Sequence, residues 1–206
     1  MRPPRSHNES VTDQLYLSLW LNRPNRATRL RHFEHLLKLF PFSQREQPQS
    51  TVSVLAIDDT QPRLLEQPVN GPLDPEALLP IFREYNADDI AYRIESWWDL
   101  WQLDEGNAKL APARVSLACF GPEFDEGVDA GQEDLRIDFG VDTNFLPQTG
   151  VPANTRLIES NIKSLLRLVH ELESTLPVAK RRLETESGEN FADRLQQALA
   201  ASHRPQ

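Results

Sequence analysis

The chain has 206 residues, of which 39% are hydrophobic and 26% charged, a balance typical of a globular protein rather than a disordered or membrane one. Its apolar runs are far shorter than the roughly 20 residues that cross a bilayer, and no apolar stretch follows the charged N-terminus as in a secretory signal. The single cysteine, Cys119, excludes an internal disulfide and fits a reducing compartment. We therefore expect a cytoplasmic protein that does not contact membranes.

The net charge of −9 is unevenly distributed along the chain. Residues 1–45 hold eight basic and three acidic side chains, a charge of +5, so the remaining residues carry −14. Because affinity for nucleic acid comes mainly from neutralised phosphates, this balance disfavours nucleic acid as a partner. We expect the basic segment to pack on its own acidic body, and a local role in binding a polyanion is the alternative.

The first 45 residues predict a flexible N-terminus over 1–10 and a basic helical arm over 11–45. In residues 11–21 the leucines alternate as in a strand, but a repeat at i,i+4 and a capping residue favour a short helix. Residues 25–40 have apolar side chains at a spacing of three to four and predict a second helix, which Pro41 ends.

The segments that follow predict a hairpin and a helix. Residues 50–59 are rich in β-branched side chains and predict a strand that residues 62–69 can pair with. Residues 73–86 predict a helix with Asp74 as its N-cap, kinked or split at Pro80 because proline cannot donate the helical hydrogen bond.

Residues 90–102 contain three of the four tryptophans, Trp97, Trp98 and Trp101, and their apolar pattern fits either a strand or a helix. The turn-like sequence that follows and the strand pattern of residues 113–120 favour a hairpin, because a strand needs a neighbour. In a strand, Trp98 lies in the core, whereas Trp97 and Trp101 point to the opposite face.

The C-terminal half predicts one further strand and two helices. Residues 134–140 alternate as a half-buried strand, residues 155–176 carry the apolar stripe of a long amphipathic helix, and a short helix follows Ser187. The predicted fold class is therefore α+β: an antiparallel sheet of about four to five strands, with a meander over 90–140, covered by a long C-terminal helix and preceded by N-terminal helices.

The whole chain, 1–206, is expected to be a single domain. Its α+β core spans residues 50–176, and residues 177–206 are a C-terminal helical extension.

No motif in the sequence specifies a reaction. The carboxylates of residues 122–142 could bind a divalent cation, but they fail the EF-hand spacing. His32 and His35 have the i,i+3 spacing of metal ligands without a third ligand nearby. Cys119 and His170 could form a nucleophile pair, but a cysteine in the middle of a strand is more often a buried, inert thiol. We expect no catalytic residues, no metal and no cofactor.

The sequence therefore favours a non-enzymatic intracellular protein–protein interaction module, an adaptor or chaperone-like subunit. Tryptophan anchors and the basic outer side of helix 25–40 are the features expected to bind the partner. The candidate partner-binding residues are Trp97, Trp101, Arg31, His35 and Lys38. The alternative function is a metal-dependent hydrolase that uses the acidic region 122–142. Another protein is the expected partner, and a homo-oligomer is left open.

Overall fold

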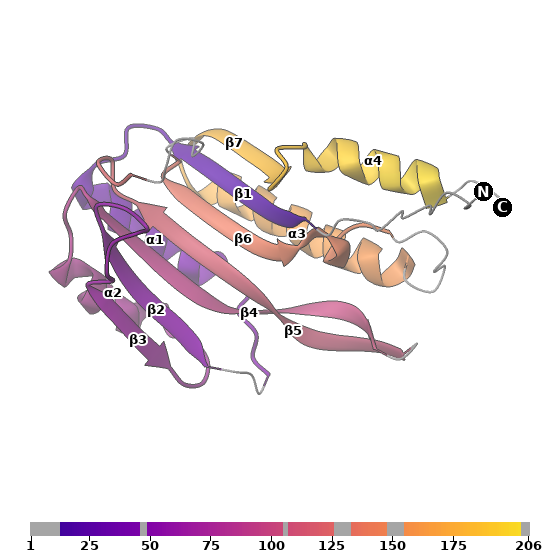
Figure 1. The fold of residues 1–206 in the computed structure, drawn as a ribbon, viewed down its shortest axis with the longest axis horizontal. Helices are drawn as coiled ribbons and strands as arrows, with labels where there is room; N and C mark the ends of the chain where they lie inside the picture. Colours follow the sequence, from indigo (N-terminus) through magenta and orange to yellow (C-terminus); the bar gives the residue numbers. More distant parts are fainter. Residues whose placement is uncertain (1–12, 46–48, 105–106, 126–132, 148–154, 203–206) are drawn as a thin grey trace, which may run out of the picture.

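The computed structural model describes residues 13–45, 49–104, 107–125, 133–147 and 155–202. Within these ranges, seven strands form one antiparallel sheet in the order β3-β2-β4-β5-β6-β1-β7 (Figure 1). The strands are β1 (Gln14–Leu21), β2 (Ser50–Ala56), β3 (Leu65–Val69), β4 (Ile90–Asp104), β5 (Asn107–Phe120), β6 (Leu135–Val141) and β7 (Val178–Thr185). The helices are α1 (Arg26–Leu39), α2 (Pro75–Glu84), α3 (Thr155–Thr175) and α4 (Phe191–Ser202), with a short 3₁₀ turn η1 (Asp142–Asn144).

The predicted sheet of four to five strands under a long C-terminal helix is wrong in two respects. The sheet has seven strands in the described part of the chain, and the two that the sequence did not predict are β1 and β7. The chain's last helix is the short α4, and the long helix α3 is followed by β7 rather than by a helical extension.

Residues 11–21 contain β1 rather than the expected short helix. Leu15, Leu17 and Leu19 are fully buried, and β1 pairs with β6 on one side and β7 on the other. A strand that is central in a sheet needs one apolar face, and the alternating leucines provide it. The partners of β1 lie more than 100 residues away, so local periodicity could not decide between helix and strand.

The remaining elements follow the sequence patterns closely. The 50–59 and 62–69 segments pair as β2 and β3, and residues 90–140 form the expected meander β4-β5-β6. Asn25 caps α1 in a reciprocal capping box with Thr28. Helix α2 begins at its predicted cap, Asp74, and continues through Pro80 as one element instead of splitting there.

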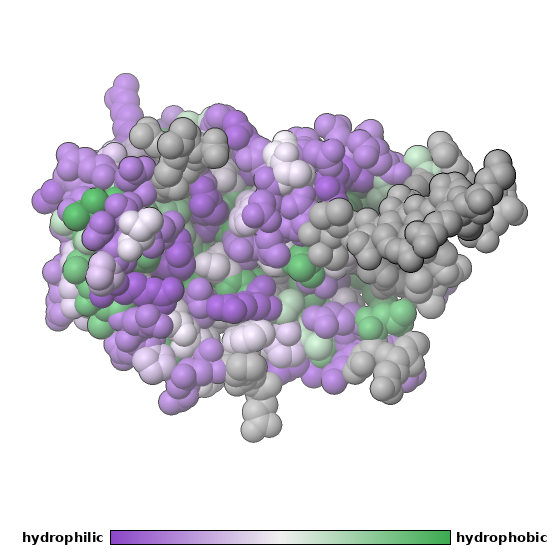
Figure 2. Space-filling model, in the orientation of Figure 1, coloured by the Kyte–Doolittle hydropathy of each residue, from purple (hydrophilic) through white to green (hydrophobic). Residues whose placement is uncertain are grey.

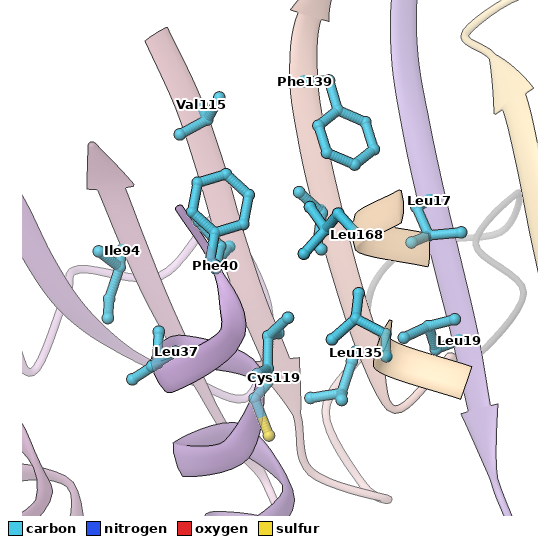
Figure 3. Packing of buried hydrophobic residues seen from close by; sticks show 14 of the residues in the cluster. Leu17, Leu19, Leu37, Phe40, Ile94, Val115, Cys119, Leu135, Phe139 and Leu168 are labelled. Carbon is cyan, nitrogen blue, oxygen red and sulfur yellow. The ribbon is translucent and has the colours of Figure 1, made fainter. Parts of the chain in front are cut away.

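Helices α1, α2 and α3 lie on one face of the sheet, α4 extends beyond the end of β7, and the other face has no helix in the described part of the chain (Figure 1). Figure 3 shows the core between the two layers, where Leu37 of α1 lies near Ile94 of β4 and Leu168 of α3 lies near Leu17 of β1. Trp98 is 3% exposed and contacts the rings of Phe40, Phe139 and Phe145, as predicted for a strand residue that faces the core.

Two free edges of the sheet each contain a proline whose nitrogen faces outward. The N–H of Phe120 in β5 donates to Asp134 O on the β6 side. Backbone N–H groups alternate in direction along a strand, so the nitrogen of Pro112, eight residues earlier, points to the same side. At Pro112 this side is free of other described strands, because the pairing with β6 ends at Ser116. The N–H of Ile57 donates to Asp89 O, so the odd-numbered residues of β2 direct their N–H groups toward β4 and the even-numbered ones toward β3. Pro68 is paired with Thr51, an odd-numbered residue, so its nitrogen points away from β2 to the outer side of β3. Proline occupies an edge without losing a ladder hydrogen bond only in this orientation.

The opposite orientations of Trp97 and Trp98 predict different costs of truncation. Trp98→Ala removes a buried side chain with three aromatic neighbours and should lower the free energy of unfolding by about 3–5 kcal/mol. Trp97→Ala, at a half-buried position on the other face, should cost far less. Urea unfolding of the two variants measures both costs, and equal losses would contradict the assignment of the two faces.

Candidate functional site

The face of the sheet that no described helix covers, which we call the open face, is mostly hydrophilic (Figure 2). Paired residues of antiparallel strands lie side by side, so the register aligns the side chains of this face in rows across the strands. The arginine row contains Ser53, Arg93, Ala118, Arg136, Ser18 and Arg182. The neighbouring acidic row contains Thr51, Glu95, Ser116, Asp138, Tyr16 and Glu184.

The open face is interrupted where β5 and β6 separate, a feature we call the fork. Pairing of β5 with β6 ends at Ser116 and Asp138. Two residues later, Gly140 has a φ of 75°, which favours glycine, and its N–H bonds to Asp138 Oδ1 at 2.7 Å. Strand β1 also shifts register between Gln14 and Tyr16, opposite the same part of β6. The three irregularities coincide at one place in the sheet, where the backbone of Gly140 still lies close to Arg114 O.

A hollow of about 550 Å³ lies at the fork. The polar side chains among its lining residues are Gln14, Glu95, Gln102, Arg114, Ser116, Asp138 and Asn144. A second hollow of about 260 Å³ adjoins it along the two rows and shares Glu95, Ser116 and Asp138 with the first. Asp138 and its two shared neighbours therefore lie at the centre of the concave part of the open face.

The arginines of this region already have carboxylate partners. Arg114 pairs with Glu95 at 2.6 Å, and Arg93 pairs with Asp59 at 2.8 Å.

The third arginine of the two hollows, Arg136, pairs with Glu133, which also accepts a hydrogen bond from Ser18. Asp138 makes no ion pair with any described residue, and its one hydrogen bond to a described residue comes from the N–H of Gly140. The hollow thus contains a carboxylate whose charge no arginine partner balances directly.

Burial perturbs the ionisable groups in and near the site. Burial raises the pKa of Asp138 above its ordinary value, and the bond from Gly140 and the nearby arginines offset this only in part. Burial and the neighbouring charge of Asp138 raise the pKa of Tyr16 to about 12. Cys119 points to the core, where burial raises the pKa of its thiol to about 12, so it is not a reactive nucleophile.

The structure separates the five candidate partner-binding residues into two surfaces. Trp97 and Trp101 lie on the open face, where Trp97 is directly opposite Arg114 of the hollow. Trp101 is 36% exposed, and its backbone N–H and C=O both bond to the side-chain amide of Asn161 in α3.

Arg31, His35 and Lys38 lie on α1, whose opposite side packs against the other face of the sheet. Lys38 forms ion pairs with Glu34 and Glu76. The geometry does not bring the basic residues and the tryptophans together into one surface.

The carboxylates of 122–142 do not converge in the described part of this region. Glu133 pairs with Arg136, Asp134 accepts the N–H of Leu21, and Asp142 pairs with Arg194. Glu126 and Asp129 lie outside the described residues. No group of three metal-ligating side chains occurs among the residues that the structure describes.

His32, one of the two histidines considered as metal ligands, is buried in α1. Its Nδ1 has no hydrogen-bond partner among the described residues, and burial lowers the pKa of its imidazole.

Comparison of the chain with protein-family models, with curated proteins and with solved structures gave no match. None of the described helices combines the length and the apolar character needed to cross a membrane.

The sequence gives little indication of Asp138 as a site residue. It alternates with buried side chains in residues 134–140 and so resembles any solvent-facing residue of a strand. Its setting depends on the fork and on the ion pairs of neighbouring strands, which only the tertiary structure defines.

The raised pKa of Asp138 predicts that its charge lowers stability. An isolated aspartate ionises near pH 3.8 and the folded Asp138 at a higher pH, so the cost is absent below pH 3.8 and complete above the folded pKa. Asp138→Asn should therefore raise the free energy of unfolding at pH 7, and this gain should shrink toward pH 4. Urea unfolding at the two pH values measures it.

A control of opposite sign is available in Asp88. A hydrogen bond from Arg26 holds the pKa of Asp88 below its ordinary value, so Asp88→Asn should lower stability at pH 7. A loss of stability at pH 7 in Asp138→Asn would contradict the prediction.

Proposed function

We propose that this chain is a non-enzymatic protein-binding module, an adaptor or chaperone-like subunit, that binds a partner polypeptide across the open face of its sheet. The observation that carries the proposal is the open face itself, where a hollow at the fork lies beside the half-buried Trp97. Tryptophan is enriched among the residues that dominate binding energy at interfaces. The single-cysteine composition is the basis for a cytoplasmic location in this proposal.

The chemistry of the open face favours binding over catalysis. Ser116 and Tyr16 both pair in register with Asp138, but neither hollow is lined by a histidine or cysteine of the described residues. The hollows therefore contain neither a thiol nor the imidazole base that commonly activates a serine. The arginines of the two hollows form ion pairs while Asp138 does not, and such a charge pattern suits recognition of a complementary surface.

The proposal is tested with an array of random 15-residue peptides probed with the labelled full chain. Trp97→Ala should reduce the signal of the bound peptides by about tenfold, which corresponds to the loss of one interface anchor. Arg31→Ala is the matched control, because Arg31 is exposed on the helical side of the molecule. It should leave the signal unchanged.

Circular dichroism of both variants establishes that they are folded. Binding that survives Trp97→Ala but is lost in Arg31→Ala would move the interface to α1. An array that binds no peptide above the level of a denatured sample would contradict the proposal.

A further inference from the structure

The hollow at the fork contains a carboxylate without an ion-pair partner among the described residues. This is Asp138, which lies where the two hollows meet, and the three arginines that line the two hollows each pair with another carboxylate. An ionised carboxylate that is partly withdrawn from water is stabilised by a cation or by hydrogen-bond donors. Only one donor, the N–H of Gly140, is supplied by the described residues.

The two hollows also contain neutral side chains that can accept hydrogen bonds from a cation. Ser116 and Tyr16 flank Asp138 on the neighbouring strands, and each carries a hydroxyl. Gln14, Gln102 and Asn144 also line the hollow at the fork, and each side-chain amide has an oxygen that can accept a hydrogen bond. A group with several N–H donors and one positive charge can satisfy this set.

We propose that the hollow at the fork binds the cationic end of a lysine or arginine side chain from the partner polypeptide, with Asp138 as its counter-ion. This inference rests on the proposed function, since it names the chemistry of the partner. The net charge of −9 favours the approach of a basic partner. Burial raises the pKa of Asp138, so a cation that binds beside it would lower this pKa again.

The test uses side-chain analogues, so that it does not depend on knowing the partner. The full chain labelled with ¹⁵N is titrated with propylammonium and with propylguanidinium, and 1-propanol serves as the neutral analogue. We expect saturable shifts of the backbone amides of Ser116, Gly140 and Val141 with at least one of the two cations. The comparison of the two cations distinguishes a lysine from an arginine as the bound side chain.

Asp138→Asn should weaken the binding of the cation by about tenfold or more, because the substitution removes the counter-ion but keeps an acceptor for Gly140 N–H. Glu66→Gln is the matched control, since Glu66 is an exposed carboxylate of β3 outside both hollows. It should leave the shifts unchanged.

Each outcome supports or contradicts the inference. Shifts that are absent, that occur equally with 1-propanol, or that persist in Asp138→Asn would overturn it. If peptides bind through Trp97 while the cations do not bind, the inference fails and the proposed function stands. If the cations bind and no peptide does, the hollow is a small-molecule site and the proposed function fails.

Discussion

The insertion of β1 between β6 and β7 is the constraint on which the rest of the structure depends. It joins the described beginning of the chain to its last strand, and it buries Leu15, Leu17 and Leu19 completely. Without β1, the strand β7 would have no partner among the described strands, since it pairs only with β1. Such long-range pairing costs loop-closure entropy before it adds contacts, so the sheet is completed only when distant parts of the chain meet.

The same insertion fixes one wall of the hollow. Asp13, directly before β1, and Asp142, directly after β6, both form ion pairs with Arg194 of α4. Their chain neighbours Gln14 and Val141 line the hollow at the fork. The ion pairs of Arg194 therefore hold the wall of the hollow that β1 and β6 form, opposite the wall that β4 and β5 form.

The sequence predicted most elements of the meander but not the arrangement around it. Residues 90–102 and 113–120 are neighbours in the chain, so a local argument paired them correctly and placed Trp98 in the core. Residues 11–21 fitted two periodicities equally well, and only their distant partners decided the outcome. The basic segment within β7 shows mostly exposed side chains and no apolar alternation, because it lies at an edge of the sheet.

The candidate site was predicted in part. The parity of a strand was sufficient to place Trp97 and Trp101 away from the core. It was not sufficient to identify Asp138, because charged side chains are ordinary at the solvent-facing positions of a strand that is buried on one face. What distinguishes Asp138 is the pairing of every neighbouring arginine with another acid, and the partners Asp59, Glu95 and Glu133 come from three separate segments.

The outward-facing nitrogens of Pro68 and Pro112 affect how copies of the protein meet one another. An exposed strand edge can act as a template for another chain, and the row of free N–H groups is what the second chain recognises. At both prolines this row is broken, so edge-to-edge growth of the sheet loses a hydrogen bond at each attempt. The two prolines therefore disfavour the addition of a further strand at β3 and at the free part of β5, and they leave β7 as the outer edge of the described sheet whose backbone no proline interrupts.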